Sequence, residues 1–85
     1  MKVGQKYYII THAYYHVVGE VTAVISPKLV SLKNVVLVYS SSRSWTDFFK
    51  SGFAKGDRFD VTTDMANCSV INAWDWPHPI PKEKS

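Results

Sequence analysis

The chain has 85 residues, a net charge of +3 and a single cysteine, Cys68. This length is that of one domain, and so small a domain buries only about 60% of its unfolded surface. A single cysteine excludes an intrachain disulfide and indicates a reducing compartment, so self-association is the expected way to bury further apolar surface.

The sequence contains no segment typical of a membrane span or a signal peptide. Its longest apolar run covers residues 35–39, whereas a spanning helix needs about 20 apolar residues. We therefore expect a cytoplasmic protein with no membrane partner. The mildly basic charge admits a polyanion such as nucleic acid as a partner without requiring one.

The first half of the chain predicts strands joined by short turns. One strand is expected over about residues 6–12 and a second over residues 15–25, where the odd positions, from Tyr15 to Ile25, are apolar and should face inward. Gly19 lies in the middle of the second strand. A glycine there permits the bend by which small barrels close.

A turn over residues 26–28 precedes the third strand. This strand covers residues 29–33, and residues 35–39 either extend it or form a fourth strand. Asn34 interrupts the alternation of apolar and polar residues and predicts a bulge. The polar residues 40–44 then predict a loop.

One short helix is predicted around residues 45–51. Ser44 and Asp47 have the spacing of a capping box, and Gly52 follows as a helix-ending residue. Residues at positions i, i+3 and i+4 share one helix face. Three aromatic side chains are therefore expected on one face of this helix, those of Trp45, Phe48 and Phe49.

The second half of the chain predicts two further strands. A turn over residues 54–57 precedes a strand over residues 58–62, and a turn over residues 65–67 precedes a last strand over residues 69–75. Prolines then end the strand pattern.

These elements predict a single small β-barrel domain over residues 1–76 and an extended, proline-rich tail over residues 77–85. The fold class is all-β with a small α element. Five short strands, one of them bent, favour an SH3-like or Sm-like barrel, and the OB-fold is the alternative architecture.

Two segments of the chain resemble the motifs of Sm-like proteins. Residues 18–38 (VGEVTAVISPKLVSLKNVVLV) are similar to the first Sm-type motif, with a glycine in a bent strand, a turn and an alternating strand. Residues 64–74 (DMANCSVINAW) loosely resemble the second motif. The resemblance implies a barrel and a ring of subunits. The Asp and Asn of Sm RNA sites and the glycine of the second motif have no clear counterpart, so it does not imply uridine binding.

The whole chain also resembles a family of small phage and prophage proteins of unknown function. The similarity lies in KYYIITHAYYHVVGEV near the start, SWTDFFKSG in the middle and WPHPIP, residues 76–81, near the end. In the last motif the spacing between tryptophan and histidine differs from that of the family. The resemblance implies a barrel acting in an infected bacterial host, and it implies no activity.

Catalytic and metal chemistry are not predicted. His12 and His16 are four residues apart, which in an extended strand separates them by about 13 Å, too far to share one ion. The chain has no G-x-S-x-G elbow, no closely paired carboxylates and no glycine-rich phosphate loop. We expect no catalytic residue, no metal and no cofactor, and therefore no enzyme.

Aromatic and basic residues provide the main functional pattern, because aromatic rings stack on bases and cations contact phosphates. Arg43 lies in a serine-rich loop beside Trp45, where no structural need for it is evident, and could hold a phosphate with its serine neighbours. The alternatives are that the helix aromatics cap the barrel and that residues 40–44 form a solvated loop. The candidate ligand-binding residues are His12, Tyr14, His16, Arg43, Ser44, Trp45 and Lys50.

The sequence-based hypothesis is a non-enzymatic, homo-oligomeric phage barrel that binds nucleotide material. The ligand would be an RNA or DNA strand, or a small nucleotide that carries a host immune signal. The alternative is a structural or protein–protein interaction module, either a virion component or an inhibitor of a host protein.

Overall fold

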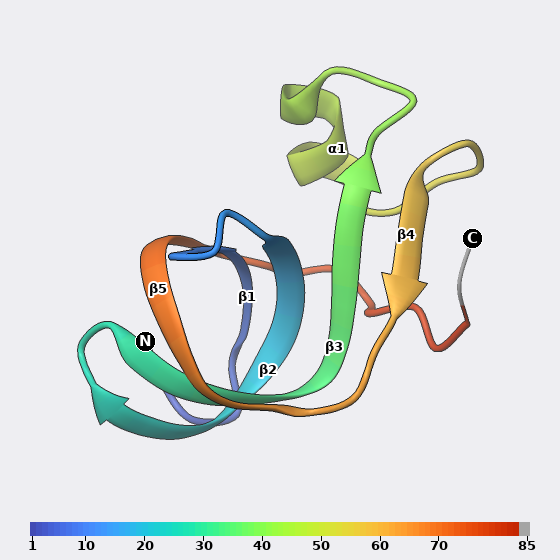
Figure 1. The fold of residues 1–85 in the computed structure, drawn as a ribbon. Helices are drawn as coiled ribbons and strands as arrows, with labels where there is room; N and C mark the ends of the chain where they lie inside the picture. The colour runs from blue at the N-terminus through green and yellow to red at the C-terminus, as the bar shows by residue number, and fades with distance from the viewer. Residues whose placement is uncertain (84–85) are drawn as a thin grey trace.

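The computed structural model describes residues 1–83, which form five antiparallel strands and one short helix (Figure 1). The elements in chain order are β1 (Lys6–Thr11), β2 (His16–Ser26), β3 (Leu29–Ser40), α1 (Trp45–Ser51), β4 (Arg58–Val61) and β5 (Met65–Asp75). The predicted all-β class with one helix is confirmed.

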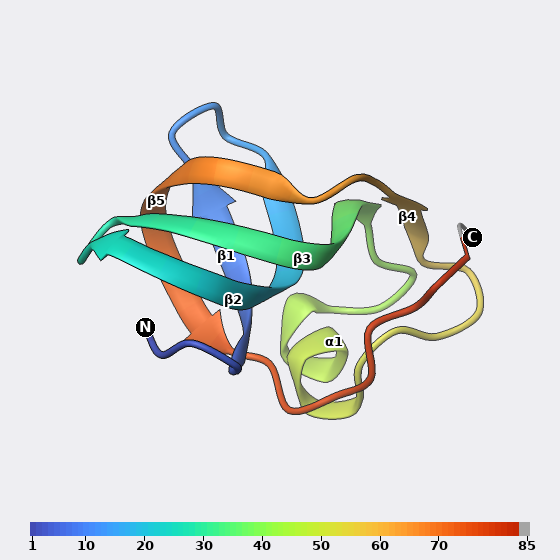
Figure 2. The same cartoon turned by 90° about the horizontal axis from the view of Figure 1, so that it is seen from below.

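The sheet curls until it is barrel-like, because four of its strands have a neighbour on both edges. β1 pairs with β2 and β5, and β3 also pairs with β2 and β5. β4 extends the sheet from the second half of β3. Figure 2 shows these strands wrapped around one another, with α1 outside them. The SH3-like or Sm-like identity of this fold, and the OB-fold alternative, stay predictions.

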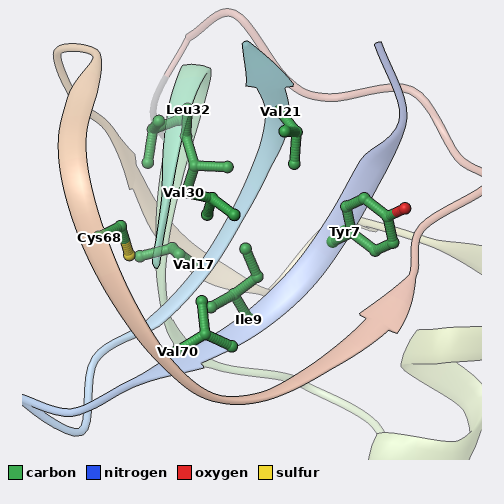
Figure 3. Close-up of a cluster of buried hydrophobic side chains, with 9 residues drawn as sticks. Tyr7, Ile9, Val17, Val21, Val30, Leu32, Cys68 and Val70 are labelled. Atoms are coloured by element: carbon green, nitrogen blue, oxygen red, sulfur yellow. The ribbon is translucent and has the colours of Figure 1, made fainter. Parts of the chain in front are cut away.

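The inside of the curled sheet holds the inner core, shown in Figure 3. Val17, Gly19 and Val21 of β2 are buried as predicted, but Tyr15, Ala23 and Ile25 are exposed, Tyr15 to 58% and Ile25 to 52%. Tyr15 precedes the strand, and Ile25 lies near the end of a β2–β3 hairpin that extends beyond the reach of β1, whose last partner is Glu20. The inner core consists of Tyr7, Ile9, Val17, Val21, Val30, Leu32, Val35, Cys68 and Val70.

A second cluster, the outer core, lies where α1 covers the other face of the sheet. It contains Tyr8, Val18, Val38, Phe48 and Trp76, all at most 7% exposed. Because the sheet is buried on both faces here, three consecutive residues of β2, from Val17 to Gly19, are buried. Period-two alternation predicts only one buried face. The outer core therefore depends on where α1 packs.

Two irregularities decide the strand boundaries. Asn34 has a φ of 54°, and the register of β3 against β2 shifts around it, so the predicted bulge is confirmed within one continuous strand. The predicted turn over residues 65–67 is wrong. Met65 already pairs with Leu32, and Asn67, with a φ of 55°, bends the backbone inside β5 instead of ending it.

The first part of the proline-rich segment packs back onto α1. The Nε2 atom of His78 lies 2.7 Å from the Phe49 carbonyl oxygen, and Lys6 Nζ donates to the His78 carbonyl oxygen at 2.6 Å. Ile80 packs against the outer core. His78 and Ile80 of the predicted tail therefore contact the rest of the domain, and residues 84 and 85 of that prediction lie outside the described part of the chain.

Gly52 lies against His78, so a substitution at this position tests whether the segment is docked. Its φ of 83° and ψ of −165° suit glycine, and a Cβ atom there would lie 2.9 Å from Cβ and Cγ of His78. Gly4 has a similar φ of 85° with nothing within 4 Å of its Cβ position.

We expect Gly4→Ala to lower the free energy of unfolding by about 1 kcal/mol, from backbone strain alone. Gly52→Ala should lower it by roughly 2 to 4 kcal/mol, because the added Cβ also overlaps His78. Urea denaturation of both variants measures the difference, and equal losses would contradict the contact.

Candidate functional site

The β1–β2 turn, the C-terminal half of β3 and the start of α1 lie at one end of the sheet (Figure 1). An open groove is lined by residues of these three segments. Its volume is about 370 Å³. The aromatic groove, as we name it, is lined by Tyr14, Tyr15, His16, Leu37, Val38, Tyr39 and Trp45. Four of its aromatic side chains are 43% to 79% exposed, those of Tyr14, Tyr15, Tyr39 and Trp45.

The β1–β2 turn places two of these rings in solvent. The amide of Tyr14 donates to the Thr11 carbonyl oxygen at 2.9 Å, and the amide of Thr11 donates to the Tyr15 carbonyl oxygen at 2.9 Å. Tyr14 adopts a φ of 62° in this tight turn. The backbone polar groups are thus satisfied within the turn, while both tyrosine rings stay outside the core.

His16 and Tyr8 connect the groove to the outer core. The Tyr8 hydroxyl oxygen lies 2.5 Å from His16 Nδ1, and the two rings meet edge to face with centroids 5.6 Å apart. Tyr8 is only 1% exposed. Burial raises the pKa of the Tyr8 hydroxyl well above its ordinary value, so this group stays protonated.

Trp45 is held at the mouth of the groove by the start of α1. Ser44 is the N-cap, and its Oγ accepts a hydrogen bond from the Asp47 amide at 3.2 Å, as the predicted capping pattern requires. The Trp45 ring lies 5.4 Å from the Phe48 ring and 5.9 Å from the His16 ring, centroid to centroid. One part of Trp45 therefore caps the outer core, and the exposed part lines the groove.

Arg43 has a structural role that the sequence did not reveal. Its guanidinium donates to the carbonyl oxygen of Gly52 at 2.6 Å, to Oγ of Ser51 at 2.5 Å and to Oδ2 of Asp57 at 3.0 Å. The side chain thus joins the end of α1 to the loop before β4. The interpretation that no structural need exists for Arg43 is wrong.

Asp57 is the partner that sequence reasoning missed, because it looked like an ordinary turn residue. It is 2% exposed and accepts hydrogen bonds from the amides of Ser42 and Ala54 and from the hydroxyls of Ser41 and Ser42. Burial alone would raise the pKa of this carboxyl, but these hydrogen bonds and that from Arg43 together hold the pKa below its ordinary value. The serine loop is therefore ordered around a buried carboxylate.

The remaining predicted site residues lie elsewhere. Lys50 follows Trp45 by five positions, which places it about 140° away around the helix axis. His12 lines a different hollow of about 250 Å³, beside Cys68 and Ser69. Of the seven predicted residues, Tyr14, His16 and Trp45 line the groove, and Ser44 is the N-cap of the helix that begins at Trp45.

Sequence reasoning also missed four residues that line the groove: Tyr15, Leu37, Val38 and Tyr39. Tyr15 was assigned to the buried face, and Leu37 to Tyr39 were read only as strand. Tyr39 is exposed, and its hydroxyl donates to Asp60 Oδ2 at 2.8 Å. A hydrophobic pattern cannot show which strand end faces an adjacent turn and helix.

The chemistry of the groove is aromatic and nearly uncharged. No lysine or arginine is among the residues that line it. Within residues 1–83, no three His, Cys, Asp or Glu side chains are grouped as a metal site would require. In that same part of the chain, no helix is long and apolar enough to cross a membrane. The groove can stack planar groups and form hydrogen bonds, but it does not neutralise a phosphate.

Comparisons with known proteins provide no family for this chain. It matches no family model, and no curated protein and no solved structure matches it. Its function is therefore argued from the groove itself.

The Arg43 contacts generate a stability prediction. Arg43→Ala leaves the buried Asp57 carboxylate without its cation, so we expect a loss of about 3 kcal/mol in unfolding free energy. Lys50→Ala removes a cation of the same helix region from an exposed position, and should change stability by no more than about 0.5 kcal/mol. Equilibrium urea unfolding compares the two. Equal stability of both variants would show that Arg43 does not hold the helix.

The lowered pKa of Asp57 generates a pH prediction. Because the folded state favours the charged carboxylate, its contribution to stability is complete above the unfolded pKa of about 4 and is lost as pH falls through the lower folded pKa. Asp57→Asn should therefore be less stable at neutral pH and should lose less stability than the parent below pH of about 4. Asp64→Asn, at an exposed position, is the control and should keep the parental pH dependence. Thermal unfolding across pH measures this, and parallel curves for Asp57→Asn and the parent would refute it.

Proposed function

We propose that the protein is a non-enzymatic binding domain that holds the base of a nucleotide, or of unpaired nucleic acid, in the aromatic groove. The observation that carries this proposal is the exposure of Tyr14, Tyr15, Tyr39 and Trp45 around one opening. Bases stack on such rings because every base has a π face, and each stacked base contributes about 1 to 3 kcal/mol.

The size of the groove favours a small ligand. Its volume of about 370 Å³ lies near the lower end of the roughly 300 to 1,000 Å³ typical of ligand sites. An opening of this size suits one base or a base and its sugar. Large exposed aromatic patches on small domains generally mark binding surfaces, which supports a ligand over an unoccupied surface.

The absence of lysine and arginine from the lining changes the expected ligand. A protein that follows a nucleic acid strand uses cations along the backbone, and Arg43, proposed from the sequence as a phosphate contact, is bonded to Asp57. The groove therefore favours recognition through the base, with the phosphates outside it. A small nucleotide is a better candidate than a long strand, and its affinity should depend weakly on salt.

The resemblance to phage proteins provides a setting for this proposal. In an infected bacterial cytoplasm, a domain that holds a small nucleotide would sequester a host immune signal. Self-association belongs to the same proposal. A domain of 85 residues buries little apolar surface alone, and the exposed rings of neighbouring copies could share a ligand. Native mass spectrometry of gently purified protein measures both the subunit number and any bound nucleotide.

A protein–protein interaction module is the second candidate. The uncharged lining and the apolar contribution of Leu37 and Val38 favour it, because interface cores are rich in aromatic side chains and poor in charge. The partner would then be a virion component or a host protein.

Calorimetric titration with uridine monophosphate and a short oligo(dT) tests the proposal. We expect Tyr14→Ala and Tyr15→Ala each to lower affinity roughly 5- to 150-fold, corresponding to one lost stacking contact. Trp74→Ala is the control, because Trp74 is 44% exposed but does not line the groove. Equal losses in all three variants, or no binding of either probe by the parent protein, would contradict base binding. A co-purifying protein lost only from the two tyrosine variants would instead support the interaction module.

A further inference from the structure

The hydrogen bond between Tyr8 and His16 reaches from the outer core to the wall of the aromatic groove. Its oxygen–nitrogen distance is 2.5 Å, which joins the Tyr8 hydroxyl to Nδ1 of the imidazole. His16 lines the groove, whereas Tyr8 is 1% exposed and lies among the rings of the outer core. A buried group thus contacts one nitrogen of a ring that lines the groove.

Burial of Tyr8 decides the direction of this hydrogen bond. If Nδ1 carried the proton, the Tyr8 hydroxyl hydrogen would need a second acceptor, and no other partner of this hydroxyl exists among the described residues. An unsatisfied buried donor costs about 1 to 3 kcal/mol. If the hydroxyl donates to Nδ1, the hydroxyl hydrogen and Nδ1 are both satisfied. Burial also keeps the hydroxyl protonated, because it raises the pKa of Tyr8.

Donation to Nδ1 determines the form of the neutral imidazole. A neutral histidine carries one proton, so an acceptor at Nδ1 requires the proton to be on Nε2. Nε2 lies across the ring from Nδ1 and therefore points away from Tyr8. No protein acceptor for Nε2 is found among residues 1–83. The Nε2–H group is available to a ligand.

We infer that His16 is the hydrogen-bond donor of the aromatic groove and that Tyr8 is the positioning residue that keeps its proton on Nε2. The ligand class follows: a planar group that carries a hydrogen-bond acceptor on its edge, such as the carbonyl oxygen of a pyrimidine base. The part of this inference that concerns the ligand rests on the proposed function.

The orientation of His16 suits this class of ligand. The imidazole and the Trp45 indole are tilted by only 36° and their centroids lie 5.9 Å apart. An N–H bond lies in the plane of its own ring, so the Nε2–H bond lies within 36° of the plane of the Trp45 indole and of a base stacked parallel to it. This tilt lets a donor on His16 meet an acceptor on the edge of a base whose face stacks on Trp45.

Nitrogen-15 NMR of the imidazole is the ligand-free test. In spectra of the singly protonated ring, we expect His16 to show a protonated Nε2 and an unprotonated Nδ1. Tyr8→Phe removes the hydroxyl with little change in shape, and should shift His16 toward a mixture of both neutral forms. A His16 ring protonated on Nδ1 in the parent protein overturns the inference, whatever the behaviour of the variant.

Calorimetric titration with uridine monophosphate is the second test. His16→Phe keeps a planar ring but lacks the donor, so affinity should fall roughly 2- to 10-fold. His16→Gln restores an N–H near the position of Nε2 and should bind more tightly than His16→Phe. Thermal unfolding confirms that both variants are folded. Equal affinity of His16→Phe and the parent overturns the donor role. Failure of the parent protein to bind overturns the proposed function, and is distinguishable because the NMR result does not need a ligand.

Discussion

The packing of α1 on the outside of the sheet through Tyr8 is the interaction on which the rest of the structure depends. Tyr8 lies in β1, yet its ring contacts rings from β2, α1 and β5, and also that of Trp76, the residue that follows β5. Its hydroxyl is hydrogen-bonded to His16. Removing this ring would leave a cavity between β1 and the helix that covers it. Its aromatic neighbours are His16, Trp45, Phe48, Phe49, Trp74 and Trp76.

Arg43 and Asp57, two charged residues near α1, hold the helix and do not line the aromatic groove. Arg43 and Asp57 bond to each other and to the loops at either end of α1, so neither charge lines the groove. A surface with exposed rings and no cation distinguishes ligands by stacking and by single hydrogen bonds. This division supports the proposal that the groove binds a base, whereas the mildly basic composition admitted a polyanion partner without requiring one.

Most strands and the helix could be predicted from local patterns, because alternation, capping and glycine act over a few residues. Ser44, Asp47 and Gly52 define the helix, and Asn34 marks the bulge in β3, as expected. Asn67 also shows a turn-like φ, but pairing of Met65 with Leu32 keeps it inside a strand. The turn-like backbone at Asn67 was therefore predictable from local sequence. Its place inside β5 was not, because that strand begins where Met65 pairs with Leu32, far away in the sequence.

The sequence by itself determined the class of the fold, the position of the helix and the aromatic character of the site, because these follow from residue type and local spacing. Only the tertiary structure decided which aromatic rings are exposed and which charges are paired. Tyr15 and Tyr8 are both tyrosines in strand-like surroundings, yet one lies in solvent and the other in the outer core. Arg43 and Asp57 are 14 residues apart and meet only when the chain closes around α1. Burial and pairing of this kind depend on long-range contacts, which no local pattern specifies.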